Sequence, residues 1–288
     1  MTADPFRTVC PGDTPNGNCE PSPMRLKDAI LVVAHPDDEV LWFSSVVSTV
    51  SKVIIVFSGN PRVPGLGGSR EALLAAYPLD TAELLGLTES CSFDAADWPN
   101  ARRSEHGLEL KAPLTIRNAY RRNYDRLVPL LDHALADSRV VLTHSPWGDY
   151  GHEEHVQVYA AVAATQIKHG FEIWYPGYVS DRSWPLMQES VLGFSHNYET
   201  MNTNRDLAHD LAALYRSHDC WTWYDDYIWP VQETFFLDSG RVATTGSTAF
   251  GGNFPVNVLR LGLHQGRPRL RMLSRILKRL GKRERTVS

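Results

Sequence analysis

Apolar and polar positions alternate along the chain in two different periods. Four short apolar runs, rich in β-branched and aliphatic residues, are typical of buried parallel strands. They lie at residues 28–34, 52–57, 140–142 and 172–175. Four longer stretches repeat their apolar residues with a helical period, at residues 38–49, 116–137, 156–167 and 206–215. Strands that alternate with helices predict an α/β fold with a doubly wound, mostly parallel sheet.

Three further segments lack a clear period. Residues 92–97 are a candidate for one more short strand. Residues 98–116 carry mixed charges and two prolines, which predicts an irregular excursion over the rim of a pocket. Residues 58–70 are rich in glycine but lack the spacing of a phosphate-binding loop, so we expect a flexible loop on the substrate side.

The predicted strand at residues 28–34 leads directly into the sequence AHPDDE at residues 34–39. Ligands bind at the carboxyl ends of strands in open parallel sheets, where this sequence would lie. His35, Asp37 and Asp38 supply an imidazole and two carboxylates, which suits a divalent metal with one carboxylate left to act as a base. The alternative is an acidic helix start, in which the carboxylates complement the helix dipole.

A second polar cluster follows the predicted strand at residues 140–142. It reads THSPWGDYGHEEH, residues 143–155, and leads into the predicted helix at 156–167. His152 and His155 are three residues apart, so on a first helical turn one could bind a metal and the other lie beside the substrate. The alternative is a polar helix start without a ligand. For His144 we favour a structural role at the strand end, or at most a contact behind the metal ligands.

Together, the AHPDDE and GHEEH stretches resemble the LmbE/PIG-L family of zinc-dependent N-acetylglucosaminyl deacetylases. The pattern of that family is AHPDDE followed by a GH-(P/E)-(D/E)-H block, and both motifs occur here in order. The resemblance covers about residues 27–258 and implies a single Rossmann-like domain. An N-terminal extension, residues 1–26, would precede this domain, and a tail, residues 259–288, would follow it.

The resemblance also implies a metal site and a base. His35, Asp38 and His155 would be the metal ligands, and Asp37 would be the general base. The implied cofactor is Zn²⁺, one per chain, with another divalent metal as the alternative.

Further roles are implied for three residues of the second cluster and for two residues outside both motifs. Tyr150 would help to hold the oxyanion, and His152 would be the general acid. Glu154 stands where the family usually has Asp and would orient His152. Arg70 is the candidate for substrate binding after the glycine-rich loop. His218 replaces the Gln of a family Ser-Gln pair near the pocket and is a second candidate to contact substrate, with a structural role at the helix end as the alternative. A non-catalytic binding module would need neither a base nor an acid, so the set indicates an enzyme.

The implied reaction removes the acetyl group from an N-acetylglucosaminyl substrate. The alternative is a related zinc amidase that acts on a small soluble N-acetylglucosaminide, a glycolipid or a thiol-sugar conjugate. Five aromatic residues crowd one segment, at Trp221, Trp223, Tyr224, Tyr227 and Trp229. They could pack in the core or form a wall for a large acceptor. With the irregular rim, they favour a bulky acceptor such as a glycopeptide antibiotic precursor, which one subset of the family deacetylates.

Composition is ordinary for one globular domain, with 288 residues, 43% apolar and 22% charged. No apolar stretch reaches 18 residues, and residues 1–26 lack the pattern of a secretory signal, so we expect a cytoplasmic protein. The four cysteines show no CxxC spacing, which argues against a structural zinc site. Cys10 and Cys19 flank a turn-rich loop that a disulfide could close, although free thiols are expected in the cytosol.

The C-terminal tail is strongly basic. Residues 267–288 hold nine Arg or Lys and one acid, whereas the whole chain carries a net charge of −4. Leucines repeat at helical spacing, at Leu270, Leu273, Leu277 and Leu280. The helix could pack on the acidic body, or it could make peripheral contact with an anionic membrane. Binding to nucleic acid is not expected, because no fold motif for it is present and an acidic body repels phosphates.

Overall fold

The apolar runs pair into one seven-stranded sheet in the computed structural model, which describes residues 24–191, 194–238 and 254–261. Its strands are β1 (Ala29–Val33), β2 (Lys52–Gly59), β3 (Ala82–Thr88), β6 (Val140–Thr143), β7 (Glu172–Pro176), β9 (Phe194–Asn202) and β10 (Gln232–Asp238). Their spatial order is β3-β2-β1-β6-β7-β10-β9. The five strands from β3 to β7 run parallel, whereas β10 is antiparallel to both β7 and β9. The predicted α/β fold with a mostly parallel sheet is confirmed.

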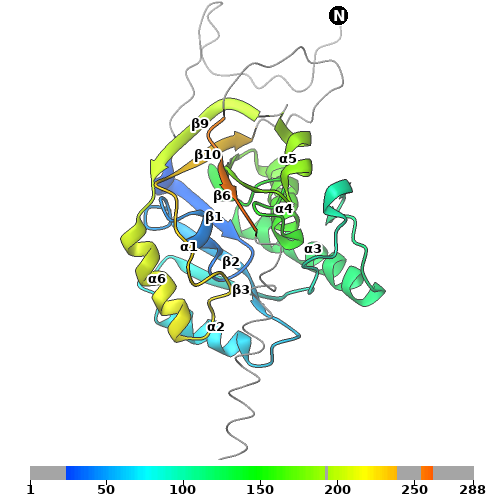
Figure 1. Ribbon diagram of the computed structural model, residues 1–288, viewed down its shortest axis with the longest axis horizontal. Coiled ribbons are helices and arrows are strands. Elements are labelled where there is room, and N and C mark those ends of the chain that lie inside the picture. The colour runs from blue at the N-terminus through cyan, green and yellow to red at the C-terminus, as the bar shows by residue number, and fades with distance from the viewer. Residues whose placement is uncertain (1–23, 192–193, 239–253, 262–288) are drawn as a thin grey trace, which may run out of the picture.

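Helices cover both faces of this sheet. They are α1 (Asp38–Trp42), α2 (Leu66–Ala75), α3 (Leu114–Ala134), α4 (Glu153–His169), α5 (Trp184–Val191) and α6 (Arg205–Ser217). Figure 1 shows α1, α2 and α6 on one side and α3 and α4 on the other. Successive side chains of a strand point to opposite faces, so Leu31 and Val33 join the core under α6, whereas Val32 joins the core under α3 and α4.

Smaller elements surround the sheet. β4 (Arg103–Ser104) and β5 (Gly107–Leu108) form a short antiparallel hairpin, and β8 (Tyr178–Ser180) pairs in parallel with β11 (Asn257–Leu259). Two 3₁₀ turns, η1 (Leu26–Asp28) and η2 (Trp98–Asn100), complete the described elements. Residues 98–116 thus contain only η2, the hairpin and the start of α3, in agreement with the predicted irregular excursion.

The order of strands changes direction at β1. This strand pairs in parallel with β2 on one side and with β6 on the other. A sheet that reverses its strand order in this way opens a crevice outside the carboxyl ends of the two central strands. The AHPDDE stretch follows β1 and the GHEEH stretch follows β6, so the fold brings both motifs to the same edge of the sheet.

The helix predicted at residues 38–49 is wrong in length. Helix α1 ends at Trp42, and hydrogen-bonded turns follow it. The backbone N–H of Ser45 donates to Glu233 Oε2 at 2.7 Å, so it is not available to continue the helical ladder. Serines and β-branched residues also dominate residues 44–51, and these residue types favour turns or strands over a helix interior.

Two further predictions need correction. Residues 92–97 do not form a strand, because Asp94 within them and Cys91 just before them adopt positive φ angles that break an extended backbone. The strand at that edge of the sheet is β3, which follows Pro78. Residues 58–70 are only partly a loop, since helix α2 starts at Leu66.

Several predictions fall outside the described residues. They concern most of the N-terminal extension, the pairing of Cys10 with Cys19, and nearly all of the basic tail. Cys91 and Cys220 are buried, and neither takes part in a disulfide among the described residues. None of the helices in the described ranges combines the length and the apolar character that crossing a membrane requires.

Candidate active site

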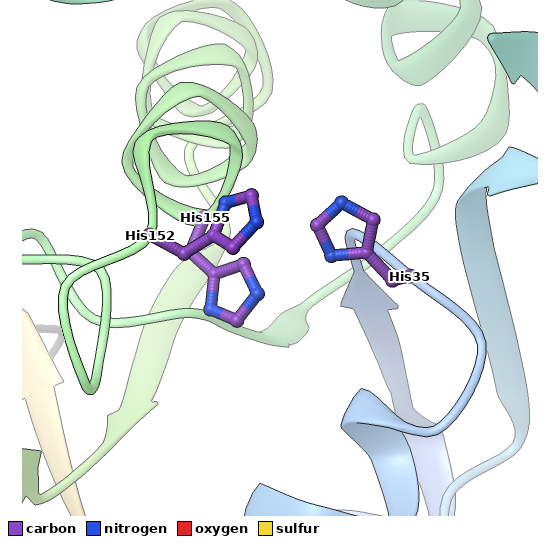
Figure 2. Close-up of side chains that lie close together, drawn as sticks. All are labelled: His35, His152 and His155. Carbon is purple, nitrogen blue, oxygen red and sulfur yellow. The ribbon is translucent and has the colours of Figure 1, made fainter. Parts of the chain in front are cut away.

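The three predicted metal ligands meet at the edge of the sheet. His35 follows β1, Asp38 is the first residue of α1, and His155 lies in the first turn of α4. Asp38 Oδ2 lies 3.2 Å from His35 Nδ1 and 3.3 Å from His155 Nε2. Zinc bonds of about 2.0–2.1 Å in a tetrahedral site separate ligand atoms by about 3.3 Å. Figure 2 shows the ring of His35, on the loop after β1, facing the rings of His152 and His155 at the start of α4. The spacing through Asp38 therefore fits a metal site.

The protonation of His155 also fits a metal ligand. Its Nδ1 lies 2.9 Å from Asp149 Oδ2, so Nδ1 carries the proton that this contact needs. Its Nε2 then presents a lone pair toward Asp38. This nitrogen is buried and has no hydrogen-bond partner among the described residues. A buried acceptor without a donor is costly unless a cation or water meets it, so the atom suits a bound metal.

His35 is held in the matching orientation. Its Nε2 lies 2.9 Å from Glu154 Oε2, which leaves Nδ1 to face Asp38. Burial lowers the pKa of His35, but contacts with Asp38 and Glu154 outweigh it and raise the pKa overall. Burial alone would raise the pKa of Asp38, yet the charge of His155 and the histidine contacts around it hold that pKa well below its usual value. Asp38 is thus an anion that would attract a cation.

Three groups of possible metal ligands have atoms that all lie within 4.8 Å of one another. They are His35 with His152 and His155, Asp38 with His144 and His155, and His35 with Glu89 and Glu154. Each group shares one or two residues with the predicted ligand set. His144 is occupied at both nitrogens, since Nε2 accepts the N–H of Ala34 at 2.8 Å and Nδ1 contacts Asp149 at 2.6 Å. The favoured structural role of His144 agrees with these contacts. Glu89 is paired with Arg70 at 3.0 Å, which neutralises the third group.

The predicted base lies beside the ligands. Asp37 precedes α1 with a left-handed backbone (φ 97°), which is strained for a residue other than glycine. Burial, reinforced by the charge of Asp38, raises the pKa of Asp37 to about 7. The N–H and hydroxyl of Thr222 both donate to its Oδ2, at 2.8 and 2.6 Å. A carboxylate with a pKa near neutrality is suited to accept a proton from water at physiological pH.

Comparison with known families supports this geometry. Residues 30–166, which carry both motifs, match the sequence profile of the family described as PIG-L, GlcNAc-PI de-N-acetylase. These residues therefore form a PIG-L family domain. No curated protein matches the chain.

Several solved structures are similar to this chain. The zinc-inhibited form of the teicoplanin deacetylase has a TM-score of 0.49 at 14% identity and covers 76% of this chain and 100% of its own. A deacetylase–teicoplanin complex has a TM-score of 0.44 at 12% identity, with 73% and 97% covered. The A40926 pseudoaglycone deacetylase has a TM-score of 0.38 at 13% identity, with 74% and 97% covered. Since these TM-scores lie below 0.5, the relationship to the family rests on the match of residues 30–166.

The remaining motif residues of the PIG-L domain surround the predicted ligands. His152 caps α4, and its Nδ1 accepts the backbone N–H of Glu154 at 3.1 Å. Its ring stacks on His155, with centroids 4.8 Å apart and planes at 18°. The ring of Tyr150 stands perpendicular to His155, with centroids 5.3 Å apart. Both residues therefore lie beside His155, and their roles as acid and oxyanion donor stay predictions.

Glu154 requires a correction. We expected its carboxylate to orient His152, but Oε2 contacts His35 and Oε1 accepts from the N–H and hydroxyl of Ser90. Only the backbone N–H of Glu154 reaches His152. The reason is that Glu154, in the first turn of α4, projects toward the loop after β3 and the end of β1. Its carboxylate thus holds His35, a predicted metal ligand.

The two predicted substrate-binding residues differ in their placement. Arg70 is buried, and its Nη1 bonds to Glu89 Oε1 and to the carbonyls of Phe57 and Ser58. Its Nε and Nη2 have no hydrogen-bond partner among the described residues, so they keep donors for another group. His218 caps the end of α6, and in the described part of the chain no contact joins its ring to the site histidines. The structure thus brings Arg70, but not His218, into the network around the site.

The aromatic segment divides between core and site. Trp221 and Trp229 are buried, with ring centroids 6.2 Å apart. Trp223 is partly exposed, and its ring packs at 4.7 Å from Tyr150 and at 5.1 Å from Trp42. Core packing therefore describes Trp221 and Trp229. Trp223 lies beside Tyr150, and its role in a wall for the acceptor stays a prediction.

Two residues of the site were not predicted. Asp149 contacts both His144 and His155, and Thr222 donates twice to Asp37. Asp149 lies between His144 and His155 in the second cluster, so its position in the sequence was a usable signal. Thr222 lies 185 residues from Asp37 in sequence, and no local pattern marks it.

Proposed function

We propose that this protein is a zinc-dependent hydrolase that removes the acetyl group from an N-acetylglucosaminyl substrate. The observation that carries the proposal is the position of Asp38 Oδ2, within 3.3 Å of nitrogens of both His35 and His155. A three-ligand site of this kind leaves one position open for water or substrate, which is the arrangement of catalytic rather than structural zinc. The family match of residues 30–166 gives the reaction class.

His35, Asp38 and His155 would hold one zinc ion per chain. When bound, zinc lowers the pKa of water and polarises a carbonyl oxygen, which is the chemistry that amide hydrolysis requires. Asp37 accepts the proton of the attacking water, as its pKa of about 7 permits. The carbon of the acetamide gains this oxygen while its C–N bond breaks, so acetate and a free amine are the products.

His152 and Tyr150 serve the later part of the reaction. An amine is a poor leaving group until it gains a proton, and His152 would donate that proton as the C–N bond breaks. The Tyr150 hydroxyl would donate to the carbonyl oxygen as negative charge develops there. Their positions against His155, with ring centroids at 4.8 and 5.3 Å, support both assignments.

For the acceptor, we propose a bulky glycosylated molecule such as a glycopeptide antibiotic precursor. The partly exposed ring of Trp223 beside Tyr150 supports this proposal, since an aromatic face there can pack against a large aglycone. The family description names GlcNAc-PI, so a glycolipid is the second acceptor to test. Arg70, with two free donors, is the candidate to bind sugar hydroxyls. The basic tail at residues 267–288 would assist with a glycolipid by contacting anionic membrane.

The test combines metal analysis with an acceptor panel. Purified protein should hold about one zinc per chain, and mass spectrometry should detect the loss of one acetyl group from at least one acceptor. The panel contains N-acetylglucosamine glycosides, an N-acetylglucosaminyl glycopeptide, GlcNAc-PI and a thiol-sugar conjugate. Each acceptor is also offered with longer acyl chains, which separates a deacetylase from a broader amidase. Failure to release acetate from any N-acetylglucosaminyl acceptor by the zinc-loaded protein would contradict the proposal.

A further inference from the structure

The carboxylate of Asp37 is held from one side only. Both hydrogen bonds to it come from Thr222, whose N–H lies 2.8 Å and whose hydroxyl lies 2.6 Å from Oδ2. No donor of the described residues reaches Oδ1. Two donors on one oxygen fix the plane of the carboxylate and engage the lone pairs of that oxygen, so Oδ1 is the atom left to accept a proton.

The backbone of Asp37 is held by a second contact. Its N–H donates to Glu39 Oε2 at 3.2 Å. Glu39 Oε1 in turn accepts from the hydroxyls of Tyr77 at 2.8 Å and Tyr215 at 2.5 Å. Tyr215 belongs to α6, and Thr222 follows the end of that helix. Helix α6 and the segment after it therefore hold Asp37 at both the backbone and the carboxylate, which secures its strained left-handed conformation.

The residues around Thr222 make it a rigid support. Trp221 is buried against Tyr215 and Trp229, with ring centroids 6.3 and 6.2 Å away. On the other side, Trp223 packs perpendicular to Trp42 at 5.1 Å. Thr222 is thus fixed between two packed tryptophans and can hold the carboxylate in one orientation. A catalytic group needs this kind of support, because small errors in its position cost large factors in rate.

We propose that Thr222 is a positioning residue for the reaction, which orients the carboxylate of Asp37 so that Oδ1 faces the attacking water. This role rests on the proposed deacetylase function. It also gives a reason for a polar residue between Trp221 and Trp223 in the aromatic segment.

The main test compares two substitutions of Thr222 in the full-length, zinc-loaded protein. Thr222→Val keeps the shape but removes the hydroxyl, and it should lower kcat by about 10- to 100-fold with KM and zinc content unchanged. Thr222→Ser keeps the hydroxyl and should restore most of kcat. Thr203→Val is the matched control, since the Thr203 hydroxyl is buried with no hydrogen-bond partner among the described residues. If Thr222→Val had wild-type kcat, or if Thr222→Ser were as slow as Thr222→Val, the role would be wrong.

A second measurement does not depend on activity. In a double-mutant cycle, Thr222→Val, Asp37→Ala and the double variant are compared by thermal unfolding of the full chain. The two residues share one contact, so the shift in Tm of the double variant should differ from the sum of the single shifts. Additive shifts would exclude the contact. A wild-type protein inactive on every acceptor would refute the proposed function, and the cycle would still decide whether Thr222 holds Asp37.

Discussion

Asp149 Oδ2 lies 2.9 Å from Nδ1 of His155. The same oxygen lies 2.6 Å from Nδ1 of His144, whose ring stacks on His155 with centroids 3.8 Å apart. One carboxylate therefore sets the proton positions of both rings. The two attractive histidine contacts overcome burial and lower the pKa of Asp149 to about 2, so it stays charged. A charged oxygen behind a metal-binding histidine fixes the ring and raises its basicity.

We predict that Asp149→Asn weakens zinc binding by about 10- to 100-fold, because the neutral amide no longer fixes the His155 tautomer. Asn tolerates the left-handed backbone at this position (φ 56°), so the fold should persist. Competition with a chelator measures the affinity. The matched control is Asp132→Asn, which alters a surface contact with His169 at 2.7 Å and should leave zinc affinity unchanged.

The ligand and base roles at the first motif can be separated. Asp37→Asn should retain zinc but lose about 10²- to 10⁴-fold in kcat, since the amide cannot take the proton of water. His155→Ala should lose zinc, because a three-ligand site is reduced to two. Metal analysis and steady-state kinetics of both variants give the answer. Full zinc occupancy in His155→Ala would move the ligand role to His152.

The contacts of Glu154 lead to a prediction that the sequence alone would have reversed. Its carboxylate contacts His35, so Glu154→Gln should weaken zinc affinity in a chelator competition. If Glu154 instead orients His152, the variant would keep its zinc affinity and change the basic limb of the pH–rate profile. Asp132→Asn again serves as the control for a carboxylate-to-amide change near a histidine.

The predictability of the site depends on the distance between partners in sequence. His35 and Asp38 are three residues apart, and His155 lies in a compact motif after a strand, so residue type and spacing mark them as candidates and the resemblance to the family implies their ligand roles. The contacts of the Glu154 carboxylate with His35 and Ser90 could not be predicted, because these partners follow β1 and β3, far from Glu154 in the sequence. Thr222 reaches Asp37 across 185 residues and lies among aromatic residues that dominate the pattern.

The fold shows the same limit. The apolar runs of β1, β2, β6 and β7 are buried on both faces and are visible in the sequence. Strand β9 was not predicted, since its sequence FSHNYETMN is mostly polar, as expected at the outer edge of the sheet. Helix α1 was predicted too long because the contact of Ser45 with Glu233 is made across 188 residues.

The buried carboxyl group of Glu233 should make the stability of the fold depend on pH. Burial raises its pKa above the usual 4.5, although Ser45 and Tyr178 donate to it. Between the unfolded pKa and the higher folded pKa, Glu233 therefore keeps its proton in the folded protein but loses it in the unfolded chain. The stability contributed by this proton is present below the unfolded pKa and is lost as pH rises toward the folded pKa. In Glu233→Gln, the decline of Tm across this window should flatten relative to wild type. Parallel Tm–pH curves for the two proteins would contradict the assignment.

Arg182 joins the loop after β3 to the start of α4. Its guanidinium lies 4.7 Å from the ring centroid of Phe93 and 4.9 Å from that of Trp98, and it pairs with Asp94 and Glu153. Phe93 in turn packs against His152, with centroids 5.0 Å apart. Burial raises the pKa of Glu153 to about 7, and the positive charge of Arg182 opposes that rise. Arg182 therefore also stabilises the charged form of a buried carboxylate.

Removing this charge should loosen the loop beside His152. We predict that Arg182→Gln loses on the order of 2 kcal/mol of stability, because two cation–π contacts and two ion pairs disappear together. For a domain of this size the loss corresponds to a fall in Tm of about 4–8 °C. Hydrogen exchange should quicken at residues 92–98 in the variant, whereas the exposed control Arg121→Gln should match wild type in both measurements. Faster exchange confined to α5, with residues 92–98 unchanged, would show that Arg182 supports its own segment and not the loop that packs on His152.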